Sequence, residues 1–123
     1  MVVLQNVPSG SAAQVAGTFA LFALFFAVTA HIAARNVLGD VEVKKALAVG
    51  PVVPAVSFVF VALQWPAALA VPLALAADFG VLRYLYRAST RLTAYLTLIH
   101  VVVSIILGVI VFGLLALIQS APG

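Results

Sequence analysis

Two ionisable residues, Asp78 and His100, stand inside long apolar stretches of the sequence. Asp78 lies in LALAADFGVLRYLYR (73–87), and His100 lies in LTLIHVVVS (96–104). A carboxylate and an imidazole can share a hydrogen bond and a proton, so the pair is a candidate for proton transfer or cation binding. Whether the two side chains meet depends on the elements that carry them.

The composition restricts what those elements are. Hydrophobic residues make up 66% of the 123 residues and charged residues only 7%, and the mean hydropathy is +1.30. Because a water-soluble domain carries about 25% charged residues, the sequence excludes an ordinary globular fold in water. It contains no cysteine, which excludes disulfides, thiolate metal sites and thiol nucleophiles.

Four stretches are long and apolar enough to cross a bilayer, which takes about 20 residues. They span about 12–34, 46–63, 67–86 and 92–118. Gln64-Trp65-Pro66 between the second and third predicts a tight turn, with Trp65 in the headgroup layer. The sequence predicts an all-α membrane protein, a single domain over residues 1–123 with four transmembrane helices in an antiparallel bundle.

The basic residues predict its orientation. All six flank the first or the third connection, and the remaining segments have none; they are Arg35, Lys44, Lys45, Arg83, Arg87 and Arg91. By the positive-inside rule, both connections face the cytoplasm and both termini lie outside, in a multi-pass protein of the cell membrane. MVVLQNVPSGSAAQ has no basic n-region, so we expect no cleaved signal peptide.

The same basic residues indicate what the protein contacts at the membrane surface. The net charge is +3, but the basic side chains lie beside apolar spans. We therefore expect them, with Trp65, to contact the bilayer and its anionic headgroups and not nucleic acid.

Small residues predict how the helices pack. Alanines recur every three or four residues in the first span, at Ala13, Ala16, Ala20, Ala23, Ala27, Ala30 and Ala34. Such a face lets a neighbouring helix approach closely, from this chain, from a second copy or from another subunit. Thr93, Thr97, His100, Ser104 and Gly108 predict the buried face of the fourth span.

Glycine, aspartate and proline residues predict where the helices end, begin and bend. Gly39 predicts the end of the first helix, and Asp40 predicts the cap of the next. Pro51, Pro54 and Pro72 predict kinks in the second and third spans.

Asp78 and His100 lie at nearly the same depth, counted from the connection that joins their antiparallel helices. His100 is nine residues past Arg91, or about 13 Å along its helix. Two interpretations stay open: a polar clasp between the helices, and a proton or cation site. No second acid lies within the spans, which argues against a relay across the membrane.

His31 is predicted to lie near the interface, four residues before Arg35. Haem ligation by His31 and His100 would need similar depths, and the two differ by about 7 Å. We therefore expect no cofactor and no metal site.

In residue composition and pattern, LGDVEVKKALAVG (38–50) and LALAADFGVLRYLYR resemble segments of the uncharacterised small four-helix membrane proteins of halophilic archaea. The resemblance implies a small membrane bundle and brings no known activity with it.

The sequence has no paired carboxylates, no HExxH and no GxSxG, so we expect no enzyme, including one acting on lipid. It predicts a structural, assembly or accessory subunit of a membrane complex. The alternative is an oligomeric proton- or cation-coupled transporter or channel that uses Asp78 and His100.

Overall fold

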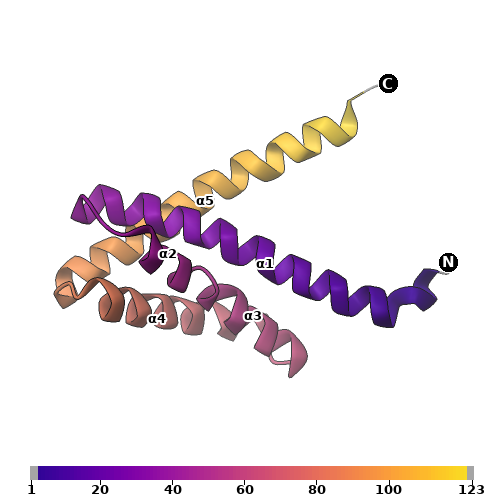
Figure 1. Cartoon of the computed structure of the whole chain (residues 1–123). Helices are drawn as coiled ribbons and strands as arrows, with labels where there is room; N and C mark the ends of the chain where they lie inside the picture. The colour runs from indigo at the N-terminus through magenta and orange to yellow at the C-terminus, as the bar shows by residue number, and fades with distance from the viewer. Residues whose placement is uncertain (1–2, 122–123) are drawn as a thin grey trace.

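The computed structural model describes the backbone of residues 3–121 and the side chains of residues 12–121, and it is almost entirely helical. The helices are α1 (Val3–Leu38), α2 (Val43–Val49), α3 (Val52–Ala62), α4 (Ala67–Tyr86) and α5 (Thr90–Ser120) (Figure 1). Within the described residues, four segments are long and apolar enough to cross a membrane: Ala12–Leu38, Val43–Ala62, Ala67–Tyr86 and Thr90–Ser120. The four predicted apolar helices are confirmed.

The second of these segments is broken into α2 and α3 at Gly50-Pro51, where we predicted a proline kink. A Cβ on Gly50 would collide with the backbone oxygen of Ala23 and the Cβ of Ala27 on α1. Because only glycine leaves room there, the backbone between α2 and α3 rests directly on the alanine face of α1. Pro51, which has no N–H, is the N-cap of α3.

The connection after α1 matches one prediction and contradicts another. Gly39 ends α1 with φ +89, and its N–H donates to the Arg35 carbonyl at 3.1 Å. The prediction that Asp40 caps the next helix is wrong. Asp40 instead forms an exposed ion pair with Arg35 at 3.5 Å. The N-cap of α2 is Glu42, which makes no capping bond with its side chain.

Both basic connections lie at one end of the molecule, and the 63–66 turn lies at the other (Figure 1). The Lys45 ammonium stands 5.6 Å from the centre of the Tyr86 ring, so α2 and α4 also meet at the basic end. The predicted position of both termini outside falls partly on residues 1–2 and 122–123, which lie beyond the described residues.

The buried core lies toward the same basic end. It is made mainly of small and branched side chains: Ala30, Ala33, Ala34, Ala46, Val49, Leu82, Tyr86 and Leu96. Away from this core, α1 and α5 diverge (Figure 1). Every described residue of α5 from Val109 onward is exposed. The bundle is therefore closed at the basic end and open at the other.

The alanine face of α1 follows this division. Ala27, Ala30 and Ala34 are buried, whereas Ala13 and Ala16 are exposed. The face packs within the chain only where the bundle is closed.

Candidate functional site

The structure brings Asp78 and His100 together. Asp78 Oδ2 on α4 lies 2.7 Å from His100 Nδ1 on α5, and each residue is 2% exposed. The two helices run in opposite directions from the short 87–89 connection, which places residues equally far from it side by side. The contact is observed, and its role stays a prediction.

Thr29 of α1 joins this pair from the other side of the imidazole. Its Oγ1 lies 3.0 Å from His100 Nε2 and also accepts a 2.9 Å hydrogen bond from the Ser104 hydroxyl. The Thr29 hydroxyl donates to the Phe26 carbonyl at 3.1 Å. One imidazole therefore connects three helices, α1, α4 and α5.

The 2.7 Å contact holds a proton between Asp78 Oδ2 and His100 Nδ1, because a carboxylate oxygen and an unprotonated ring nitrogen would repel each other at this distance. His100 Nε2 meets the Thr29 hydroxyl on the other side of the ring. Both ring nitrogens are therefore engaged inside the protein, as a polar group removed from water requires.

The rest of the predicted polar face of α5 is also turned inward. Thr93 and Thr97 are buried, and Ser104 and Gly108 are half-buried. The Thr97 hydroxyl donates to the Thr93 carbonyl at 2.8 Å, so this hydroxyl has its hydrogen-bond partner within α5.

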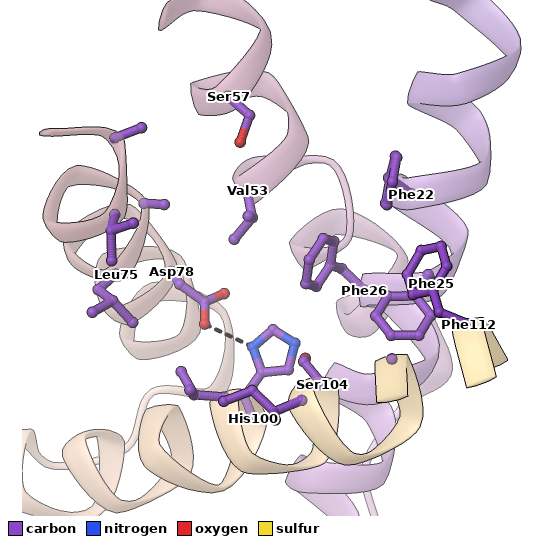
Figure 2. A pocket seen from close by; sticks show the side chains of 16 residues that line it. Phe22, Phe25, Phe26, Val53, Ser57, Leu75, Asp78, His100, Ser104 and Phe112 are labelled. Carbon is purple, nitrogen blue, oxygen red and sulfur yellow. Dashed lines mark hydrogen bonds and ion pairs between the residues drawn. The ribbon is translucent and has the colours of Figure 1, made fainter. Parts of the chain in front are cut away.

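Beside the pair lies a cavity of about 490 Å³. It is lined by α1, α3, α4 and α5, and Figure 2 shows Phe22, Phe25 and Phe26 on one side of it and Leu75 on another. Its polar lining consists of Asp78, His100, Ser57 and Ser104. Asp78 Oδ1 has no hydrogen-bond partner among the described residues.

His31, predicted to lie near the interface, has one ring nitrogen turned into the protein. It is half-buried, and its Nδ1 lies inside the protein, without a partner among the residues described. It does not meet His100, whose ring nitrogens are taken by Asp78 and Thr29. In the described part of the chain, no three His, Cys, Asp or Glu residues gather to hold a metal.

The predicted headgroup residues lie apart from this site. Arg35, Lys44, Arg83, Arg87 and Arg91 are exposed around the two basic connections, and Lys45 is half-buried. Trp65 is 51% exposed at the opposite turn and packs edge-to-face on Phe60, with ring centres 5.2 Å apart.

Thr29 is the residue that the sequence analysis missed. It lies six residues before Arg35, or about 9 Å deep along α1. A depth count on the first span, like that applied to His100, would have marked it as the hydroxyl nearest to the level of the pair.

Comparison with known proteins gives a family and no activity. Residues 9–122 match a family of unknown function (DUF7473). No curated protein and no solved structure matches the chain.

Proposed function

The chain belongs to the DUF7473 family, whose function is unknown, and we propose that it is a non-enzymatic, multi-pass protein of the cell membrane. Its role in this proposal is that of a structural, assembly or accessory subunit of a membrane complex. The Asp78–His100 pair acts as a clasp that holds the closed end of the bundle together.

The observation that carries the proposal is the use of both His100 ring nitrogens within the protein. One bonds to Asp78 on α4 and the other to Thr29 on α1. The network then ends at the Phe26 carbonyl, a group already inside α1. Because both ring nitrogens already have partners within the protein, these hydrogen bonds hold α1, α4 and α5 together and leave the imidazole no free position to pass a proton on.

The surroundings of the pair also favour a clasp over a relay. Residues 12–28, 51–63, 67–77 and 105–118 contain no ionisable side chain. A proton on the Asp78–His100 pair therefore has no side chain to move to in the open half of the bundle.

The orientation in the proposal rests on charge. The two basic connections lie at one end of the molecule (Figure 1), and the positive-inside rule assigns that end to the cytoplasm. Their exposed arginines and lysines are then placed to contact anionic headgroups.

The role as a subunit rests on the open half of the bundle. Ala13, Ala16 and Ala20 are exposed there, and small side chains favour close packing of a further helix from another subunit or a second copy. If a further helix packs on these alanines, the larger side chain of Ala16→Leu will push it away. The variant will then lose a complex that native gel electrophoresis resolves in membrane extracts. Ala76→Leu, at an exposed alanine of α4, is the control and will leave that complex intact.

One observation favours the alternative, a proton- or cation-coupled transporter or channel. The free Asp78 Oδ1 borders the cavity, where an ion or a proton donor would find an acceptor.

Flux and stability measured together distinguish the two functions. The purified chain and its Asp78→Asn variant would be placed in liposomes that contain a pH-sensitive dye, with Asp40→Asn as the control at an exposed acid. The clasp predicts equal proton flux in all three and a lower unfolding temperature for Asp78→Asn alone. Flux that disappears in Asp78→Asn while its stability is kept would establish the transporter instead.

A further inference from the structure

One buried oxygen defines what the cavity beside the pair can bind. Asp78 is 2% exposed, and its Oδ1 has no partner among the described residues. Figure 2 shows one carboxylate oxygen bonded to His100 and the other turned away from it, toward the space that Val53 and Phe26 border. A buried acceptor without a donor is costly, so an occupant that donates a hydrogen bond is stabilised there.

The hydrogen bonds of the pair fix this oxygen as an acceptor. The shared proton lies between Asp78 Oδ2 and His100 Nδ1, which are 2.7 Å apart. Asp78 Oδ1 is then either a carboxylate oxygen or the carbonyl oxygen of the acid, and neither form carries a hydrogen.

Among the described residues, no side chain donates to Asp78 Oδ1. The hydroxyls that line the cavity are Ser57 on α3 and Ser104 on α5, and Ser104 donates to Thr29. Residues 19–28, 67–77 and 105–118 have no side chain with an N–H or O–H group. A second copy in the same orientation presents the same apolar side chains at the same level, so it would leave Asp78 Oδ1 unpaired.

The walls of the cavity suit a hydrocarbon chain. They include four phenylalanines, Phe22, Phe25, Phe26 and Phe112, and the volume of about 490 Å³ is within the usual range for a small-molecule site. Phe112 is twelve residues past His100, or about 18 Å along α5. The cavity therefore extends from a polar end at Asp78 along the apolar, diverging half of the bundle.

The apolar walls of the cavity decide the head group of the occupant. An ammonium group would bring a full charge and three donors into a cavity lined mostly by apolar side chains. A hydroxyl group donates its hydrogen bond and adds no charge.

We propose that this cavity binds a neutral long-chain alcohol from the bilayer. Its hydroxyl donates to Asp78 Oδ1, and its chain lies along α5 toward Phe112. This binding activity goes beyond the structural role, since a clasp needs no ligand.

The test uses the full chain in phosphatidylcholine nanodiscs with a hexadecanol that carries a photoactivatable diazirine. We expect crosslinks on the segment that includes Phe22, Phe25 and Phe26 and on α5 near Phe112. Unlabelled hexadecanol should compete about tenfold better than hexadecyl methyl ether, which lacks the donor to the buried oxygen. Hexadecylamine should compete less well than the alcohol.

Two glycine-to-leucine substitutions in α5 provide a variant that blocks the cavity and its control. A Cβ at Gly108 would lie 3.9 Å from Phe25 Cζ, so Gly108→Leu fits the helix and fills the cavity. A Cβ at Gly113 meets nothing within 4 Å, and Gly113→Leu leaves the cavity open. We expect Gly108→Leu to abolish the crosslinks and Gly113→Leu to keep them, with both proteins equally folded by circular dichroism.

Asp78→Leu removes the proposed acceptor for the head group, and because it also removes the partner of His100, its helical content is first compared with that of the unsubstituted chain by circular dichroism. We expect the alcohol and the ether to compete equally well in this variant. Three results would overturn the proposal: crosslinks that survive Gly108→Leu, an ether that competes as well as the alcohol in the unsubstituted chain, or an amine that competes better. The second would indicate that water satisfies Asp78 Oδ1, and the third would indicate a cation site.

Discussion

The Thr29 hydroxyl oxygen lies 3.0 Å from His100 Nε2, although the two residues are 71 positions apart in the sequence. This contact places α1 against the imidazole that α4 already holds through Asp78. It makes a three-helix junction out of what would otherwise be a pairwise contact between neighbouring helices.

Replacing Thr29 by Val should weaken this junction. The substitution preserves shape and removes the hydrogen-bond partner of His100 Nε2 and the acceptor for the Ser104 hydroxyl. We expect a loss of about 1–2 kcal/mol in the free energy of unfolding, measured by SDS titration in mixed micelles. Thr29→Ser should keep most of the stability, and Thr18→Val, at an exposed threonine, should change nothing. A Thr29→Val protein as stable as the unsubstituted chain would contradict the junction.

Asp78 and His100 should depend on each other for stability. Asp78→Leu leaves His100 Nδ1 without a partner, and His100→Leu does the same to Asp78 Oδ2. Breaking a buried pair is more costly than replacing both members by apolar residues. We expect the double variant to be more stable than either single variant, with a coupling energy of about 0.5–3 kcal/mol from a double-mutant cycle. Losses that simply add would show that the contact contributes nothing.

Gly50 should be among the least replaceable small residues. Since its Cβ would collide with Ala23 and Ala27, Gly50→Ala must push α1 away from the α2–α3 break. We expect a loss of about 1–3 kcal/mol in the same SDS titration. The control is Gly80→Ala in α4, where nothing lies within 4 Å of the added Cβ and alanine favours the helix. Equal stability of the two variants would contradict the close approach.

The predictable parts of the fold depend on signals that lie along the chain. Hydropathy over a span's length identifies four helices regardless of how they pack. The depth of Asp78 and His100 was predictable because a short connection fixes how two antiparallel helices align. Gly39 ends α1 because its positive φ is strained for other residues.

The remaining features depend on contacts between segments. The position of Thr29 beside His100 depends on the rotation of α1 about its axis, and an alanine face on so apolar a helix does not fix that rotation. Asp40 has the residue type of a cap, but the helix begins three residues later and Arg35 takes its carboxylate. The divergence of α1 and α5 has no sequence signal, since lipid-facing and partner-facing helices are equally apolar.

The proposed orientation predicts opposite labelling of the two ends of the bundle. The chain has no cysteine, so a single introduced cysteine reports its own position. Glu42→Cys lies at a basic connection, and Ala67→Cys lies beside the 63–66 turn; both residues are exposed. In intact cells, a membrane-impermeant maleimide should label Ala67→Cys at once and Glu42→Cys only after permeabilisation, because the positive-inside rule keeps the basic end in the cytoplasm. Labelling of Glu42→Cys in intact cells would reverse the orientation, and equal labelling of both would mean that the two ends do not lie on opposite sides of the membrane.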